Sequence, residues 1–389
     1  MKFGFRLILI VLALTQGTSL ASVRYSYVAS DMSNLFLLGA DGRTRATLAK
    51  GNGQDYWGAC AVSPRSGIIV AELCRDGACA QSTLFRVDAR MGSKAAIPGA
   101  KGFHIPECPV WLNDSELLVD RIDNDGLDRG VFSLNVRTGK TKLVIRPLPH
   151  NEFFYEPYIP SPTGRYVLTT LCITGGSWLS VNDSVLGKGL WRTNPEEGMV
   201  GFAGVAWSGD ERQIYVAFYK DDELASSSPG GLWRFDAMTG KQHPWKYSKE
   251  SLDGVFSAPK QNVLVVERTN SIDCLRMSDG RRLSTLTYST VGGVLGAFSL
   301  SRDRWLLCGS RLVLEMDSSC KRLRTLHARG LSSSSVRYSP TRNTLMFGGV
   351  SYDGASDVKA GVLDLRTGRV TRFAANNWRI EWLPKDVRR

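Results

Sequence analysis

The stretch SPTGRYVLTT, Ser161 to Thr170, decides the fold, because it places a tight turn directly before a β-rich run. VSPRSGIIVAEL (Val62 to Leu73) and YSPTRNTLMFGG (Tyr338 to Gly349) repeat that order of residues. Aligned on the proline position, the phrase recurs every 39 to 50 residues, at Pro64, Asn113, Pro162, Gly209, Pro259, Ser301, Pro340 and Pro384. A self-similar period of this length is typical of architectures in which each copy is one structural unit.

A second phrase alternates with the first along the chain. It appears in VFSLNVRTGKTKLVI (Val131 to Ile145), LWRFDAMTGKQHPW (Leu232 to Trp245) and GVLDLRTGRVTRF (Gly361 to Phe373). Each copy reads as a strand, a short turn with glycine and another strand, because glycine supplies the positive φ of a tight hairpin. We therefore expect four strands in two hairpins per unit, and no helical periodicity competes with this pattern.

A four-stranded sheet of this length cannot bury both of its faces alone, whereas sheets arranged around an axis bury them against each other. The repeats therefore predict an all-β fold, a single β-propeller with eight four-stranded blades. The N-terminal strands RYSYVAS, SNLFLLG and TRATLA would share a blade with the C-terminal strand in WRIEWLP (Trp378 to Pro384), which closes the ring. Seven blades are the alternative, if the shorter units around Pro259 and Ser301 merge.

Three motifs carry a resemblance to a known family. They are Ser161-Pro162-Thr163-Gly164, Asp123-Asn124-Asp125-Gly126 and Leu363-Asp364-Leu365-Arg366-Thr367-Gly368. They resemble the WD40-like (PD40) repeats of TolB-like β-propellers, and the resemblance covers nearly the whole of residues 22–389. It implies a propeller fold, here expected without the N-terminal α/β domain of TolB-like proteins. It implies little about activity, because this architecture carries many functions.

Residues 1–21 have the pattern of a secretory signal peptide. Lys2 and Arg6 precede the apolar run Leu7 to Leu14, and Ser19 and Ala21 are small residues before a predicted cleavage site. A buried N-terminal strand is the alternative interpretation. We expect residues 22–389 to form the propeller domain of an exported protein, periplasmic or secreted, without a transmembrane segment, because no apolar run is long enough to span a bilayer.

The chain is basic, which bears on its partners. Its formal charge is +12, and removal of Lys2 and Arg6 with the signal peptide leaves +10. A basic surface favours acidic proteins or acidic glycans as partners, although the charge could also serve solubility alone. Because the protein is expected to be exported and has no dense basic helix, we expect no nucleic-acid partner. We also expect a monomer.

The sequence contains eight cysteines, all after residue 21. An even number in an exported chain favours disulfides. Cys74 and Cys79 flank Arg-Asp-Gly-Ala, which has the composition of a hairpin tip, so facing positions could bring their sulfur atoms together. We predict a Cys74–Cys79 disulfide. Zinc binding by this pair is less favoured, because no histidine or further cysteine follows at the required spacing.

No catalytic residue is predicted, and the G-x-S-x-G elbow of serine hydrolases is absent from the sequence. One alternative remains. His104 and His150 precede the innermost strands of adjacent blades, and Glu107 and Glu152 lie nearby in sequence. These residues could hold a metal over the central channel. The oligogalacturonate lyases, which are propellers of similar repeat type, bind a divalent metal with several histidines at this place. These residues could equally be polar loop residues with ordinary hydrogen bonds. We expect no cofactor if the protein is a non-catalytic binding module.

Trp178 differs from the other tryptophans, which mostly fall in or beside the repeated phrases. It lies in TGGSWLSVNDS, which we interpret as part of an enlarged hairpin loop from Thr174 to Gly189. An exposed tryptophan on a long loop is a candidate contact residue. The sequence thus favours an exported, non-catalytic binding module that holds a protein or a glycan at one face of the ring. A metal-dependent, lyase-like enzyme is the alternative.

Overall fold

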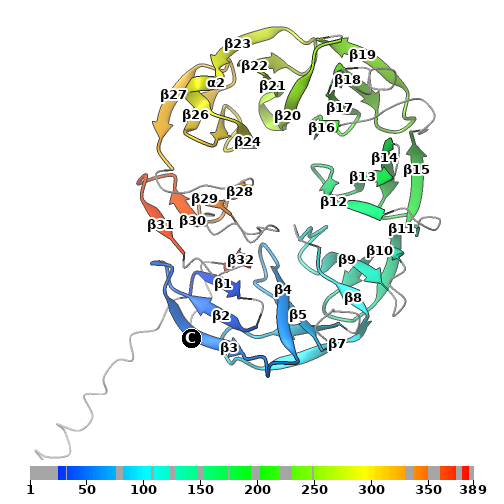
Figure 1. Cartoon of the computed structure of the whole chain (residues 1–389), viewed down its shortest axis with the longest axis vertical. Coiled ribbons are helices and arrows are strands. Elements are labelled where there is room, and N and C mark those ends of the chain that lie inside the picture. The colour runs from blue at the N-terminus through cyan, green and yellow to red at the C-terminus, as the bar shows by residue number, and fades with distance from the viewer. Residues whose placement is uncertain are drawn as a thin grey trace, which may run out of the picture.

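In the computed structural model the described residues form eight four-stranded antiparallel sheets arranged as a closed ring (Figure 1). The structure describes residues 25–384 except 32, 76–81, 107–108, 123–127, 148–152, 174–175, 194–201, 220–229, 248, 329–335, 349–359 and 374–378. The helices in this part of the chain are a 3₁₀ turn, η2 (Pro259–Gln261), and one turn of α-helix, α2 (Tyr288–Val291). The predicted all-β propeller is confirmed.

We number the blades 1 to 8 in order around the ring and give their strands from the innermost to the outermost. Blade 1 consists of β32 (Arg379–Trp382), β1 (Tyr27–Ser30), β2 (Leu35–Leu38) and β3 (Thr44–Ala49), and blade 2 of β4 (Tyr56–Val62), β5 (Ile69–Cys74), β6 (Thr83–Val87) and β7 (Lys94–Lys101). Blade 3 consists of β8 (Phe103–His104), β9 (Glu116–Ile122), β10 (Asp128–Asn135) and β11 (Thr141–Ile145), and blade 4 of β12 (Phe153–Pro160), β13 (Tyr166–Ile173), β14 (Gly176–Asp183) and β15 (Lys188–Arg192).

Blades 5 to 8 follow the same order. Blade 5 consists of β16 (Phe202–Trp207), β17 (Gln213–Phe218), β18 (Gly231–Asp236) and β19 (Gln242–Lys246), and blade 6 of β20 (Leu252–Ala258), β21 (Val263–Arg268), β22 (Ser271–Arg276) and β23 (Arg282–Thr287). Blade 7 consists of β24 (Val294–Ser299), β25 (Arg304–Gly309), β26 (Val313–Asp317) and β27 (Arg322–Leu326), and blade 8 of β28 (Val336–Ser339), β29 (Thr344–Phe347), β30 (Gly361–Asp364) and β31 (Val370–Arg372).

The ring closes as the sequence predicts, by sharing blade 1 between the two ends of the described chain. Strand β32 pairs antiparallel with β1, with Tyr27 opposite Trp382 and Ala29 opposite Ile380. The two lie side by side in Figure 1. The seven-blade alternative is wrong, because the segments after Leu252 and after Val294 form separate sheets, blades 6 and 7.

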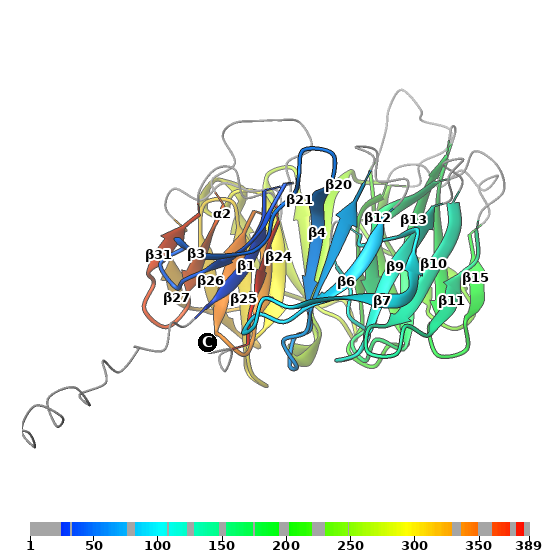
Figure 2. The ribbon, with the colours of Figure 1, turned by 90° about the horizontal axis from the view of Figure 1, so that it is seen from below.

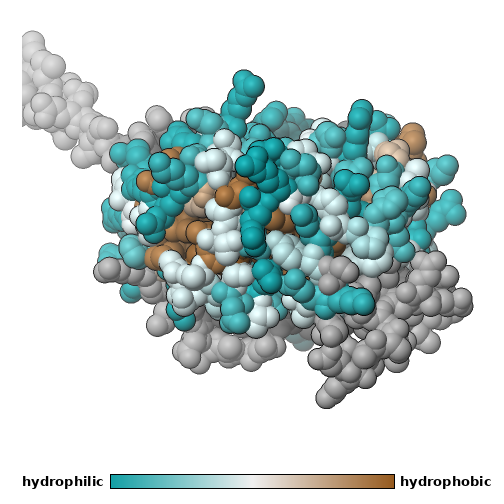
Figure 3. All heavy atoms as spheres, turned by 90° about the horizontal axis from the view of Figure 1, so that it is seen from above, coloured by the Kyte–Doolittle hydropathy of each residue, from teal (hydrophilic) through white to brown (hydrophobic). Residues whose placement is uncertain are grey.

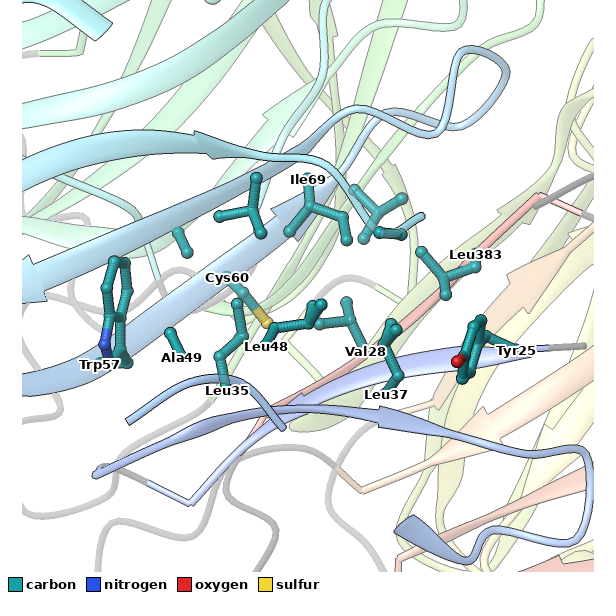
Figure 4. Close-up of a cluster of buried hydrophobic side chains, with 14 residues drawn as sticks. Tyr25, Val28, Leu35, Leu37, Leu48, Ala49, Trp57, Cys60, Ile69 and Leu383 are labelled. Atoms are coloured by element: carbon teal, nitrogen blue, oxygen red, sulfur yellow. The ribbon is translucent and has the colours of Figure 1, made fainter. Parts of the chain in front are cut away.

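The blades are held together by apolar side chains packed between neighbouring sheets. Between blades 1 and 2, Val28, Leu35 and Leu37 face Cys60 and Ile69, and all five are fully buried (Figure 4). Burying one such aliphatic side chain contributes about 1.5–3 kcal/mol. Each blade thus supplies the apolar surface that its neighbour needs, which explains why the repeat recurs around the whole ring.

Glycine is required where an outer hairpin turn of one blade meets the next blade. Gly139, in the turn between β10 and β11, has φ +74°. A Cβ atom on this residue would lie 2.2 Å from the carbonyl oxygen of Pro98 in blade 2. Both the backbone conformation and the close approach therefore exclude other residues here.

Because the strands of each blade alternate in direction, the ring has two distinct faces. At one face of the ring, each innermost strand ends and the second strand of its blade begins. The Ser-Pro turns of the repeated phrase lie at this face, which we call the turn face. The opposite face is the end at which the innermost strands begin. The strands run between these two faces (Figure 2), so residues in equivalent turns of different blades gather on the same face.

Candidate functional site

Of the histidines in the sequence-predicted site, the structure describes His104, which lies at the opposite face. His104 lies in β8, the innermost strand of blade 3. Its Nδ1 atom is 2.7 Å from Oε1 of Glu72, which lies on β5 of blade 2 and has a side chain only 5% exposed. Oε2 of Glu72 accepts a hydrogen bond from the Ile105 N–H at 3.1 Å.

The other members of the predicted metal site, Glu107, His150 and Glu152, lie outside the described residues. Within residues 25–384, leaving out the gaps given above, no group of three His, Cys, Asp or Glu side chains is arranged to hold a metal. The metal hypothesis therefore stays a prediction.

The Glu72 carboxylate also belongs to a structural pattern that recurs around the ring. Glu267 on β21 of blade 6 accepts a hydrogen bond from the Val294 N–H of blade 7 at 3.0 Å. Asp120 on β9 of blade 3 accepts one from the Tyr158 hydroxyl of blade 4 at 2.5 Å. In each case an acidic residue near the end of a second strand binds the innermost strand of the next blade. The Glu72–His104 contact thus also connects two blades.

Trp178 does not lie in an enlarged loop, so this part of the prediction is wrong. Residues Gly176–Asp183 form β14, and Trp178 stands opposite Leu171 of β13 in an unbroken antiparallel register. The run SWLSVND satisfies its backbone hydrogen bonds in the sheet, and the Gly-Ser composition misled the sequence interpretation. The Trp178 side chain lies outside the described part, so its proposed contact role stays a prediction.

The cysteines divide into two groups. In the described part of the chain, Cys60, Cys274, Cys308 and Cys320 are buried and are not disulfide-bonded. Cys74 is disulfide-bonded. Its partner lies outside the described side chains, as Cys79 does, so the Cys74–Cys79 pairing stays a prediction.

The turn face is more extensively described. Neighbouring turns of the repeated phrase bind each other there: the Ser63 hydroxyl donates to the Asp114 carbonyl oxygen at 3.0 Å. The Thr163 hydroxyl likewise donates to Glu211 Oε2 at 3.0 Å. These bonds join blade 2 to blade 3 and blade 4 to blade 5. They hold the ends of the innermost strands in fixed positions around the channel.

A cavity of about 310 Å³ opens at this face, which we call the channel-mouth pocket. Its walls come from five consecutive blades, 8, 1, 2, 3 and 4, which contribute residues of their innermost strands or of the segments that follow these strands. It is rich in aromatic and proline residues, with a single acidic group. The lining residues are Val62, Pro64, Pro109, Val110, Trp111, Pro160, Tyr338, Ser339, Pro340, Thr341, Glu381, Trp382, Leu383 and Pro384.

Arg337 fixes one wall of the channel-mouth pocket. It lies on β28 of blade 8, forms an ion pair with Glu381 and donates to the Ile380 carbonyl oxygen at 2.6 Å. Its guanidinium carbon lies 5.5 Å from the ring centroid of Trp382. The Trp382 indole N–H donates to the Thr344 hydroxyl at 3.0 Å. These contacts hold the Trp382 ring in one orientation.

The outer wall of the ring offers less for recognition. Figure 3 shows hydrophilic residues over most of the described surface on that side, with hydrophobic residues in patches between them. The large hydrophobic side chains that are exposed in the described part are scattered over several blades, and they are Met91, Val185, Leu186, Tyr219, Met238, Tyr288 and Leu323. Single exposed apolar residues are normal on protein surfaces and do not define a site.

Sequence reasoning missed the channel-mouth pocket. It assigned Trp111 and Trp382 to packing between blades, and both do pack against buried clusters between neighbouring sheets, but it did not predict that they also line a cavity. A signal was nevertheless present, because Pro64, Pro340 and Pro384 share one position in the repeat. Equivalent positions in a ring converge on its axis, so repeated prolines and aromatics there predict a shared apolar rim.

Comparison with known proteins identifies the architecture and nothing narrower. Neither a known protein family nor a curated protein matches the sequence. A eukaryotic initiation factor crystal structure is 13% identical, with a TM-score of 0.56 over 94% of this chain and 100% of that one. The dihydro-heme d1 dehydrogenase NirN is 11% identical, with a TM-score of 0.52 over 93% and 74%. BamB from Moraxella catarrhalis is 15% identical over 84% and 88%, with a TM-score of 0.45.

These likenesses concern the fold alone, because all the identities are low. The initiation factor and NirN, with TM-scores above 0.5, share the overall fold of this chain. Among the described residues, no helix is long and apolar enough to cross a membrane.

Proposed function

We propose that this protein is an exported, non-catalytic binding module whose channel-mouth pocket holds an extended segment of a partner protein. The observation that carries the proposal is the convergence of five blades on one rim of prolines and aromatic side chains. Grooves lined by aromatic residues recognise extended, proline-rich peptides, because such peptides lose little conformational entropy on binding. The positive charge of the chain favours a partner with acidic residues around this segment.

Two features of the pocket support binding rather than chemistry. Its aromatic residues Tyr338 and Trp382 are partly exposed, and Trp382 is oriented by Arg337 and Thr344. A rigid aromatic residue gives contact area at low entropic cost, which is characteristic of interface hot spots. Export rests on residues 1–21, and membership of the TolB-like family rests on the repeat motifs; both belong to this proposal.

The test begins with a photo-crosslinking residue in place of Tyr338, and a matched one in place of Leu323 on the outer strand β27. A partner captured by the first and not the second is then purified and its affinity measured. We expect Tyr338→Ala to weaken binding by about tenfold or more, the size of a hot-spot loss. Binding unchanged by this substitution would refute the proposed site. Binding of an acidic glycan that depends on Tyr338 would refute the choice of a peptide.

A second candidate is a metal-dependent, lyase-like enzyme at the opposite face, and one contact favours it. Metal-binding histidines commonly use their second ring nitrogen to bind a carboxylate, as His104 does with Glu72. Elemental analysis of the purified protein, with His104→Ala as the control, tests this hypothesis. Metal bound by the wild type and lost in the variant would support it. A wild-type protein without metal, purified in the absence of chelators and after zinc or manganese supplementation, would end it.

A further inference from the structure

A second cavity at the turn face lies between blades 8 and 1, where the ring closes. We call it the seam pocket, and its volume is about 500 Å³. Blade 8 contributes the turn after β28 and the turn after β30, including Arg342, Arg366 and Arg369. Blade 1 contributes Ser26 and Tyr27. The pocket therefore combines surfaces from the two ends of the described chain.

The charges around the seam pocket are unbalanced. Three arginines line it, and Asp364 is the acidic residue among the lining side chains. None of the three arginines takes part in an ion pair with a described carboxylate. Oδ1 of Asp364 accepts bonds from the N–H and the hydroxyl of Thr367 in its own turn, at 2.7 and 2.9 Å. The pocket thus carries an excess of positive charge.

Arg342 is held in place and partly removed from water. Its Nε–H donates to the Leu383 carbonyl oxygen at 2.6 Å, and its guanidinium carbon lies 5.8 Å from the ring centroid of Tyr27. Burial lowers the pKa of Arg342 below its usual range, because the charged form is partly removed from water. Among the described residues, no hydrogen bond uses the other N–H donors of Arg342. A partly buried guanidinium of this kind gains more from an anion than an exposed lysine does.

Neutral donors complete the surroundings of this cation. Ser26 is 6% exposed, and its hydroxyl makes no hydrogen bond to any described residue. The Asn343 side chain also lines the pocket. Hydroxyl and amide groups beside an arginine are suitable donors for the several oxygens of a tetrahedral anion.

We propose that the seam pocket binds a phosphate or sulfate group, either as the free ion or carried by a larger molecule. Arginine forks match the paired oxygens of such groups, and two negative charges offset the excess of positive charge described above. The volume leaves room for a group attached to the anion. Since the pocket is built from blades 8 and 1, a bound anion would also bridge the closure of the ring. This proposal does not depend on the channel-mouth pocket.

The test measures thermal unfolding of the mature protein in sodium phosphate, sodium sulfate and sodium chloride at equal ionic strength. A ligand that binds only the folded ring raises Tm, by about 3 °C or more when its concentration is far above Kd. We expect phosphate or sulfate to give a saturable rise over chloride. We expect Arg366→Gln/Arg369→Gln to lose this rise while keeping its Tm in chloride, because both side chains are exposed.

The matched control is Arg137→Gln in blade 3, which occupies the same Arg-Thr-Gly turn as Arg366 and should respond like the wild type. Glycerol 3-phosphate and a sulfated disaccharide then separate the sources. A larger rise with either one identifies a carried group, and no larger rise identifies the free ion. Equal responses in the wild type and the double variant would overturn the proposal. A response no greater than that to chloride would overturn it too.

Discussion

Blades 1 and 6 have the same four-stranded sheet, but they are assembled differently. Blade 6 is made of consecutive hairpins from Leu252 to Thr287. Blade 1 joins β32 to β1, so its innermost strand comes from the far end of the chain. The comparison shows that a blade does not need a continuous chain, provided that side chains replace the missing covalent link.

The two blades also use arginine differently. In blade 6, Arg268 pairs with the fully buried Asp273 at 3.3 Å and with Glu250 at 2.8 Å, close to its own sheet. At blade 1, Arg337 and Arg342 both come from blade 8; Arg337 binds Ile380 of β32, and Arg342 binds Leu383, directly after this strand. The arginines of the seam therefore hold the closing strand against the neighbouring blade, where no peptide bond does so.

Removing β32 should have the largest effect on stability, because this strand closes blade 1. Deletion of residues 379–389 exposes the edge of β1 and the facing side of blade 8. The loss should be comparable with the whole stability of the domain, about 5–15 kcal/mol. We expect no cooperative thermal transition by circular dichroism. Deletion of residues 385–389 alone is the control, and a native-like Tm after the longer deletion would show that closure is dispensable.

Core truncations test whether the two blades are packed equally well. Leu35 in blade 1 and Leu264 in blade 6 are both fully buried. Leu35→Ala and Leu264→Ala should each lower the free energy of unfolding by about 2–5 kcal/mol, since each leaves a cavity. Urea denaturation measures both. A cost below about 1 kcal/mol for Leu35→Ala alone would mean that the closing blade is loosely packed.

Two arginine substitutions separate closure from ordinary stability. The Arg337 and Arg268 side chains are equally exposed, at 31%. Replacing either by methionine should cost about 1–3 kcal/mol, because charged hydrogen-bond partners remain partly buried. Arg337→Met, unlike Arg268→Met, should increase the rate of amide hydrogen exchange in β1 and β32 by more than its loss of global stability explains. Equal exchange in the two variants would remove the special role of the seam.

Alkaline pH gives the smallest expected effect and concerns the junction of blades 5 and 6. Burial raises the pKa of Tyr215 to about 12, and its hydroxyl donates to the Met277 carbonyl oxygen at 2.8 Å. The unfolded chain therefore releases this proton at lower pH than the folded one. The stability contributed is complete below about pH 10 and is lost as the pH rises towards 12.

Thermal melts of the wild type and Tyr215→Phe between pH 8 and 12 test this dependence. We expect the variant to lose less stability over that range than the wild type. At the seam, burial also raises the pKa of Tyr27, so Tyr27→Phe should behave in the same direction. Identical slopes in the wild type and Tyr215→Phe would contradict the assignment.

Much of the fold could be predicted because its determinants are local and repeated. Turn glycines such as Gly164 and Gly139 mark their hairpins wherever they occur, and the strand count at the two ends predicted the closing blade. Trp178 shows where local composition fails: glycine and serine nearby suggested a loop, yet pairing with β13 made a strand. Candidate sites were harder to predict, because His104 contacts Glu72 of another blade.

By itself the sequence determined the kind of unit, its number and the way the ring closes, because turn chemistry and strand periodicity act over a few residues. What the units enclose depends on the assembled ring. Tyr338 and Trp382 are 44 residues apart in the chain, and they meet because the ring brings equivalent turns to one axis. Arg342 and Ser26 are brought together by closure. Contacts across blades depend on the geometry of the assembled ring, which no single repeat contains.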